Sequence, residues 1–388
     1  MDKLTSELVS IASSLINYKT VSPDGNEYLC RSYLTKKFKD VRMKISVLAK
    51  NKRRPNIIGE IGNSGRSLVI ACHIDVVDAG SGWRTDPFKA VVKNGRIYGR
   101  GAIDDKGPFA ISYCAVKKFV RDYPDFKGKI YLVALADEEA DNVYGVKYLL
   151  KNGFKADAGL IPDGGYFSKL DIGEKGCLQL KIESFGKQAH SALDEYGENA
   201  LSNLTSIVEK IKLVKWPQKF DKKFSETKVN FSLFHAGEIA NTVPPYAYVQ
   251  MDIRYPFGVG SDEVFKKVKG VVANCAGKFK LKTIYKTEPH LVKDRALIKL
   301  FVRSAKKVGV DIKTIILAGN SVAKEFNEAG IPSIVHYPMD HLPIHEPNEY
   351  IEIDSMVKTV GLYYEFFKEY FGVKYKKRYS RPLEGIKI

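Results

Sequence analysis

The stretch Ser67-Leu68-Val69-Ile70-Ala71-Cys72-His73-Ile74-Asp75 decides the fold, because an apolar run ends directly in a histidine and an acid. Two later runs, residues 130–135 and 158–161, lead in the same way into Asp137-Glu138-Glu139 and Asp163. Short apolar runs of this kind are typical of strands buried in a parallel sheet. Ligands of open parallel sheets bind at the carboxyl ends of the strands. We therefore expect these side chains to lie together at one edge of a sheet.

Helical patterns alternate with strand-like runs on both sides of this stretch. Further strands are expected at residues 56–60 and 333–336, and helices near residues 26–40, 106–122, 142–152, 294–308 and 351–371. Strands that alternate with helices indicate an α/β fold. The sequence therefore predicts an α/β domain with a largely parallel, twisted sheet flanked by helices.

The middle of the chain has a different pattern. Residues 177–183 and 248–253 alternate apolar and polar side chains, and helical segments lie near residues 197–213 and 262–275. Alternation with a period of two is typical of strands with one buried face. We interpret residues 176–288 as an inserted α+β domain, and residues 1–175 with 289–388 as one larger, discontinuous domain.

The composition is globular with a basic surplus. Across 388 residues, Lys and Arg outnumber Asp and Glu by 62 to 45, which gives a formal net charge of +17. The positive residues are spread along the chain, and the densest run is Lys374–Arg378. We interpret the surplus as that of a basic soluble enzyme whose field favours anionic ligands. We do not expect a nucleic-acid partner.

The cysteines and the first residues bear on the compartment. The five cysteines are odd in number and form no Cys-x-x-Cys pair. This argues against a disulfide framework or a structural zinc finger and favours a reducing compartment. Residues 1–20 have the pattern of an amphipathic helix and not that of a signal peptide or a membrane span. We expect a cytoplasmic protein without a membrane partner.

Each polar cluster has an ordinary structural explanation when it is taken alone. His73-Ile74-Asp75 and Pro162-Asp163-Gly164-Gly165 could be turns, and Asp137-Glu138-Glu139 a solvated helix start. Asp104-Asp105 could cap the helix that follows, and His345 could be a surface histidine. Three strands that all end in potential metal ligands favour a functional site instead.

Several motifs also occur in an order that resembles the M20 metallopeptidase family. They are KTVSP (19–23), HIDVV (73–77), GWRTDPF (82–88), IYGRGAIDDKG (97–107), the Glu138-Glu139 pair, PDGG (162–165), GKQAHSA (186–192), NTVPP (241–245), DIR (252–254) and HEPNEY (345–350). That family includes acetylornithine deacetylases, succinyl-diaminopimelate desuccinylases, dipeptidases and carboxypeptidases. The resemblance covers nearly the whole chain. It implies that the larger domain is catalytic and metal-binding and that the inserted domain is a lid or dimerisation domain.

The resemblance implies two divalent metal ions bridged by Asp104. His73 and Asp163 would hold one ion, and Glu139 and His345 would hold the other. Carboxylates mixed with imidazoles suit Zn²⁺, with Co²⁺ or Mn²⁺ as alternatives.

Three further residues are implied in catalysis. Asp75 would accept a hydrogen bond from the His73 imidazole and so fix its tautomer. Glu138 would be the general base for attack by a metal-bound hydroxide and would pass the proton to the leaving nitrogen. His190 matches the family histidine that stabilises the oxyanion. Because this histidine comes from the partner subunit in dimeric relatives, we expect a homodimer through the inserted domain.

The substrate side is implied by three other residues. Arg254 and Asn241 match residues that bind a substrate carboxylate, a task that suits the guanidinium fork. Arg254 could equally form a surface ion pair. Gly319 lies in Leu317–Val322, which corresponds to a substrate-holding loop but lacks the Thr and Asp of the family pattern. This departure puts the specificity in doubt, but not the metal chemistry.

The predicted function is therefore metal-dependent hydrolysis of the amide bond of an N-acyl amino acid or of a short peptide with a free carboxylate. The alternative is a non-catalytic protein on the same scaffold whose basic surface engages an acidic partner. The sequence leaves open the acyl group, the leaving amino acid, the physiological metal and whether His190 acts within its own chain.

Overall fold

The computed structural model describes residues 1–140, 142–217, 226–317, 319–341 and 343–373, so the basic run Lys374–Arg378 lies outside the described residues. The chain forms two compact units. The first comprises Met1–Asp171, Val292–Thr314 and Ser321–Ile388, and the second comprises Ile172–Leu291 and Ile315–Asn320. None of the helices in the described part of the chain is both long and apolar enough to cross a membrane.

The first unit contains most of the helices and strands. They are α1 (Lys3–Ile16), α2 (Tyr28–Asp40), β1 (Lys44–Leu48), β2 (Asn56–Gly62), β3 (Ser67–His73), β4 (Val91–Lys93), β5 (Arg96–Tyr98), α3 (Lys106–Asp122), β6 (Lys129–Leu135), α4 (Val146–Lys151), β7 (Ala158–Ile161), α7 (Arg295–Lys307), α8 (Ala323–Glu328), β15 (Ser333–Val335), β16 (Tyr350–Glu352) and α9 (Ile353–Tyr370). Two strands, β8 (Lys169–Glu174) and β14 (Lys313–Leu317), carry the chain from one unit to the other.

Within the described residues the main sheet has nine strands, in the order β1-β2-β6-β3-β7-β15-β8-β13, with β14 paired to β8. The central strands β6, β3, β7 and β15 are parallel neighbours. The strands toward the margins pair antiparallel. The predicted α/β class with a largely parallel central sheet is therefore confirmed.

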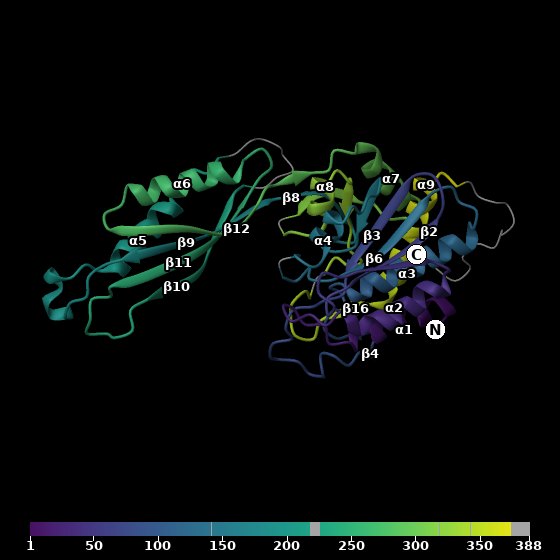
Figure 1. Cartoon of the computed structure of the whole chain (residues 1–388), viewed down its shortest axis with the longest axis horizontal. Coiled ribbons are helices and arrows are strands. Elements are labelled where there is room, and N and C mark those ends of the chain that lie inside the picture. The colour runs from purple at the N-terminus through teal and green to yellow at the C-terminus, as the bar shows by residue number, and fades with distance from the viewer. Residues whose placement is uncertain (141, 218–225, 318, 342, 374–388) are drawn as a thin grey trace. The chain divides into compact units, whose positions relative to one another are not determined.

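Helices cover both faces of this sheet, which explains why its central strands are apolar throughout. On β3, Val69 and Ala71 share a buried cluster with Val146 of α4 and Phe326 of α8. Successive side chains of a strand point to opposite faces, and Ile70 is fully buried as well. On that second face α3 packs against β3, β6 and α9 (Figure 1).

The helix predicted near residues 142–152 is shorter in the structure. It begins only at Val146, because the preceding residues form a turn around Asp137. The main-chain N–H of Asn142 donates to the Asp137 carbonyl at 2.9 Å, and that of Tyr144 to the Asp137 carboxylate at 2.9 Å. Asn142 also has a left-handed φ of 55°, which a continuous helix excludes.

The second unit is built on an antiparallel sheet. Its elements are β9 (Gly176–Phe185), η1 (Ser191–Tyr196), α5 (Ala200–Lys212), β10 (Lys228–Ala236), β11 (Tyr246–Tyr255), α6 (Ser261–Ala273), β12 (Lys278–Thr287) and β13 (His290–Leu291). The strand order is β10-β11-β9-β12. Every second residue of β11 is buried, in one cluster with Leu204 of α5 and Val264 of α6. Both helices therefore cover the same face of this sheet (Figure 1).

The second unit also includes Ile315–Asn320, which the sequence interpretation assigns to the larger domain. The physical reason is a backbone contact that the sequence does not reveal. The N–H of Lys175 donates to the carbonyl of Leu317 at 3.1 Å. Gly319 therefore belongs to the second unit.

Candidate metal centre

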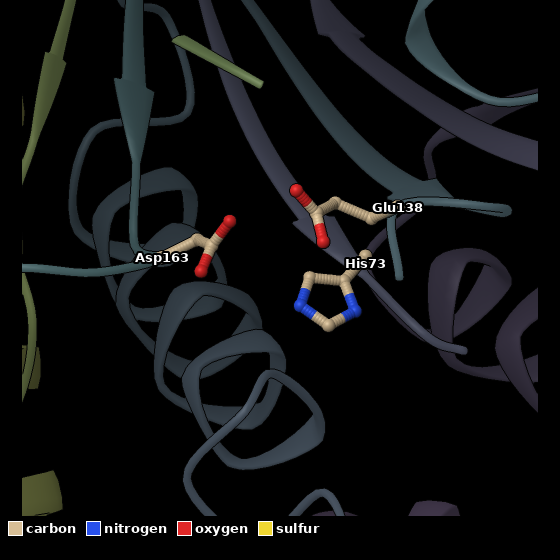
Figure 2. A group of neighbouring side chains, drawn as sticks. All are labelled: His73, Glu138 and Asp163. Carbon is tan, nitrogen blue, oxygen red and sulfur yellow. The ribbon is translucent and has the colours of Figure 1, made fainter. Parts of the chain in front are cut away.

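Three neighbouring parallel strands bring the predicted histidine and acids to one edge of the main sheet. His73 is the last residue of β3, the acid loop Asp137–Glu139 follows β6, and Asp163 follows β7. Because β6, β3 and β7 are parallel neighbours, their carboxyl ends meet at the same edge. Figure 2 shows His73, Glu138 and Asp163 pointing toward one another, each from the end of its own strand.

His73 is held by its own chain two residues further on. Its ring Nδ1 lies 2.9 Å from the main-chain oxygen of Asp75. A carbonyl only accepts, so Nδ1 carries a proton, and Nε2 is the nitrogen left to hold either a metal ion or a second proton. That Nε2 faces Asp104 Oδ1 at 2.9 Å. This tautomer is the one that a metal bound at Nε2 requires.

The predicted hydrogen bond from the His73 imidazole to the Asp75 carboxylate is not present in the structure. Its Oδ1 lies 3.8 Å from His73 Nδ1, beyond hydrogen-bond distance. The carboxylate instead accepts the main-chain N–H groups of Glu138 and Glu139, each at 3.1 Å. The tautomer of His73 is thus fixed by the backbone of residue 75, and the Asp75 side chain supports the acid loop.

Asp104 lies between the two predicted histidines. Its Oδ1 faces His73 Nε2, and its Oδ2 lies 3.2 Å from His345 Nε2. The same His345 nitrogen is 3.1 Å from Glu139 Oε1. Asp104 is buried, whereas the His345 side chain is half exposed. One carboxylate with an imidazole on each oxygen has the arrangement of a bridging ligand.

The side chains form two groups with metal-ligand spacing among the described residues. One is His73, Glu138 and Asp163, and the other is His73, Asp104 and Glu139, with the ligand atoms of each group within 4.8 Å of one another. Glu138, expected only as a base, is thus also within reach of a ligand position. The two groups share His73, and His345 adjoins the second.

The protonation equilibria of the cluster reflect crowded negative charge. Burial raises the pKa of Asp163 to about 7. Burial, then the charge of Asp163, raises the pKa of Glu138 well above its ordinary value. Hydrogen bonds to Asp104 and Glu139 raise the pKa of His345 to about 10. Buried carboxylates so close together are stable as anions only beside positive charge. The residues therefore fit divalent cations.

The loop that presents Asp104 is held by Glu349, which sequence reasoning missed. This fully buried carboxylate accepts the main-chain N–H groups of Gly101 at 3.1 Å, Ile103 at 2.9 Å and Asp104 at 3.2 Å. It also pairs with Arg100 at 2.7 Å. The HEPNEY motif contains Glu349, but only its histidine was selected. Glu349 could have been identified from the sequence, because it is an acid in the same motif as the predicted ligand His345.

The remaining predicted residues all belong to the second unit. His190 is exposed, and its Nδ1 accepts the N–H of Ala192 at 3.1 Å. Asn241 and Gly319 are exposed as well. Arg254 is paired with Asp252 of the same strand, through Nε at 2.7 Å and Nη2 at 3.1 Å. It thus makes an ion pair, the alternative considered from the sequence.

Comparison with known proteins places the chain in a family. The profile described as peptidase family M20/M25/M40 matches residues 69–369. A succinyl-diaminopimelate desuccinylase of Buchnera aphidicola is 23% identical over 376 residues, covering 94% of this chain and 99% of the relative. An uncharacterized metallohydrolase of Methanocaldococcus jannaschii is 30% identical over 346 residues, covering 81% and 84%.

A solved structure supports the same fold. A tripeptidase from Staphylococcus aureus matches with a TM-score of 0.80 at 21% identity, covering 95% of this chain and 99% of that chain. This likeness concerns the fold alone. The family profile covers most of the chain, and the resemblance seen in the motifs is confirmed. The chain belongs to peptidase family M20/M25/M40 and is a metal-dependent amidohydrolase.

Proposed function

We propose that the first unit holds two divalent metal ions and hydrolyses the amide bond of an N-acyl amino acid or a short peptide with a free carboxylate. One observation carries the proposal: Asp104 presents one oxygen to His73 and the other to His345. Around this carboxylate, Asp163 adjoins the His73 side and Glu139 the His345 side.

The donor set supports this reading. His73, Asp104 and Asp163 would hold one ion, and Asp104, Glu139 and His345 the other. Imidazole nitrogens mixed with carboxylate oxygens suit Zn²⁺, with Co²⁺ or Mn²⁺ as alternatives. Bound divalent cations would polarise the amide carbonyl and lower the pKa of water at the site.

Glu138 is proposed as the general base. Its carboxylate adjoins His73 and Asp163, and its pKa is raised, mainly by burial. A carboxylate with a raised pKa accepts a proton from water more readily and can release it again to the leaving nitrogen. The Asp75 carboxylate holds the main chain of Glu138 and so fixes where the base stands.

The second unit is proposed to supply the substrate contacts and the dimer interface. His190 would stabilise the oxyanion, in its own chain or from a partner subunit, and Asn241 and Gly319 would contact the substrate. Arg254 would bind the substrate carboxylate. Asp252 already accepts from Nε and Nη2 of Arg254, and Nη1 is buried without a hydrogen-bond partner among the described residues, so a substrate carboxylate would have to reach this buried nitrogen or displace Asp252. The cytoplasmic location stays a prediction.

The substrate class is supported by the names of relatives, a desuccinylase and a tripeptidase. The test is hydrolysis of a panel of N-acyl amino acids, dipeptides and tripeptides, each with and without added Zn²⁺, Co²⁺ or Mn²⁺. We expect activity that a chelator removes and that metal restores. A panel without any metal-dependent hydrolysis would leave the alternative, a binding protein on this scaffold.

A further inference from the structure

We infer that Arg54 is a positioning residue that holds the acid loop Asp137–Glu139 in place, through contacts with the opening turn Lys19–Pro23 and with Asp75. The inference rests on the proposed function, because it concerns where the base Glu138 and the ligand Glu139 stand. Sequence reasoning selected the opening turn as a family motif but gave it no task.

Each residue of the acid loop is held by a group that contacts Arg54. The Asp137 carboxylate accepts from Arg54 Nη1 at 2.5 Å. The Asp137 N–H donates to Glu27 at 3.2 Å. The N–H groups of Glu138 and Glu139 both donate to Asp75, whose Oδ2 lies 3.5 Å from Arg54 Nη2. Three consecutive residues thus depend on one guanidinium.

The opening turn contacts the same guanidinium. Arg54 Nη1 donates to the carbonyl of Pro23 at 2.8 Å, and Nη2 donates to Ser22 Oγ at 2.8 Å. Ser22 Oγ donates in turn to Asp75 Oδ2 at 2.5 Å. The turn also pairs with the segment around Asp75, since Ser22 N donates to the carbonyl of Val76 at 2.9 Å. Ser22 therefore links Arg54 to the carboxylate that holds both glutamates.

The space around Arg54 is fully used. Its side chain is 2% exposed, and Nε and Nη2 donate to Glu27 at 3.0 and 2.8 Å. Gly25 has a left-handed φ of 77°, and a Cβ there would lie 2.4 Å from Arg54 Nε. Only the planar fork can serve acceptors on several sides at once, because a lysine ammonium carries all its donors on one atom.

A purely structural ion pair would stabilise the fold without affecting the chemistry. Arg54 differs because its partners end at the main chain of the proposed base and of a proposed ligand. Displacement of a reacting group by about 1 Å can cost on the order of 100-fold in rate. Loss of groups that orient ligands typically costs about 10–100-fold in metal affinity or activity. If Arg54 has a positioning role, its replacement should lower both the turnover rate and the metal affinity by more than the loss of fold stability alone would.

The test compares Arg54→Lys with two control variants. Arg96→Lys makes the same change at a partly exposed pair with Glu352. Phe119→Leu lowers stability in the aromatic cluster near the end of α3, about 20 Å along the helix from Lys106 by the helical rise. For each protein, kcat and KM are measured at saturating metal. The Zn²⁺ affinity of the apo-protein is measured by competition with a chromogenic chelator, and Tm by thermal unfolding.

We expect Arg54→Lys to lower kcat by about 10–100-fold with KM changed less than about threefold, and to weaken Zn²⁺ binding about tenfold or more. The controls should keep both quantities within about twofold, including Phe119→Leu at a comparable loss of Tm. Arg54→Lys values within that range would overturn the inference. Equal losses in Arg54→Lys and Phe119→Leu would also overturn it.

Ser22→Ala keeps the inference falsifiable if Arg54→Lys does not fold. It removes only the hydroxyl between Arg54 and Asp75, and we expect about a 3–10-fold fall in kcat or Zn²⁺ affinity. Unchanged values in Ser22→Ala would contradict the positioning role. The Zn²⁺ titration is independent of turnover. A wild-type protein that binds Zn²⁺ but hydrolyses no amide would count against the proposed function alone.

Discussion

Glu138 and Glu139 are neighbours in the chain but face different partners. Glu138 adjoins His73 and Asp163, whereas Glu139 contacts His345 at 3.1 Å and adjoins Asp104. Their main-chain N–H groups share the Asp75 carboxylate, which fixes the backbone while the two side chains diverge. Adjacent acids can thus hold a metal and move a proton separately.

Replacing Glu138 by Gln tests the base. The amide keeps the shape of the side chain but cannot take a proton, so we expect kcat to fall by about 10²–10⁴-fold. Metal content, measured by elemental analysis, should stay at the wild-type level. Glu139→Gln is the matched control and should lose metal as well as rate. A Glu138→Gln variant with near-normal turnover would exclude Glu138 as the base.

Replacing His345 by Ala tests the second ligand group. This imidazole contacts both Asp104 and Glu139, and its half-exposed position makes truncation mild for the fold. We expect metal stoichiometry to fall by about one ion per chain, because three donors remain for one ion and too few for the other. His341→Ala, at another exposed histidine, should keep full stoichiometry. Full occupancy in His345→Ala would refute the assignment.

At the scale of elements, the strand β8 carries a buried carboxylate, Asp171, that is not among the proposed ligands. Asp171 is 1% exposed, and neither of its oxygens has a hydrogen-bond partner among the described residues. Burial raises its pKa from 3.8 to about 7. A strand that packs inside the sheet leaves this side chain no access to water, which explains the direction of the shift.

The shift gives a pH dependence with a definite sign. Between about pH 4 and 7 the folded protein holds a proton on Asp171 that the unfolded chain has released, so stability falls as pH rises through this window. Asp171→Asn removes the titration. We compare the free energy of unfolding of the variant with that of the wild type at each pH. We expect the difference in favour of the variant to be roughly 2–4 kcal/mol larger at pH 8 than at pH 4. Urea unfolding at both values measures this, and a difference that does not change with pH would contradict it.

At the scale of the whole molecule, the residues proposed to bind metal and those proposed to contact substrate lie in different units. All side chains of the candidate metal centre belong to the first unit. The residues predicted to contact the substrate belong to the second unit; they are His190, Asn241, Arg254 and Gly319. Each unit has its own buried cluster of apolar side chains. Metal binding should therefore stabilise one unit selectively.

Metal removal tests this division. A ligand that binds only the folded form stabilises it by an amount set by its concentration and affinity. We expect a chelator to increase amide hydrogen exchange in β3, β6 and β7, and Zn²⁺ to reverse the increase. The strands β9 and β11 should change little. Equal changes in both units would show that the metal does not act on the first unit alone.

The sequence by itself determined the central strands, the helices α1, α2, α3, α7 and α9, and the family, but it did not predict α8. Apolar runs such as residues 67–72 can be recognised as strands from the sequence, because burial on both faces of a parallel sheet requires apolar side chains throughout. The acids after these runs follow the strands directly, so their common edge follows from parallel pairing alone. The motif order identified the family without any contact being known.

Only the tertiary structure decided which groups hold these residues in place. Arg54 meets Asp137 and Glu349 meets Gly101 across long stretches of chain, and Asp75 turned out to bind the acid loop in place of the His73 ring. Local patterns specify periodicity and chain neighbours, whereas hydrogen-bond partners depend on how distant segments pack. Supporting contacts of this kind become visible only once the chain has folded.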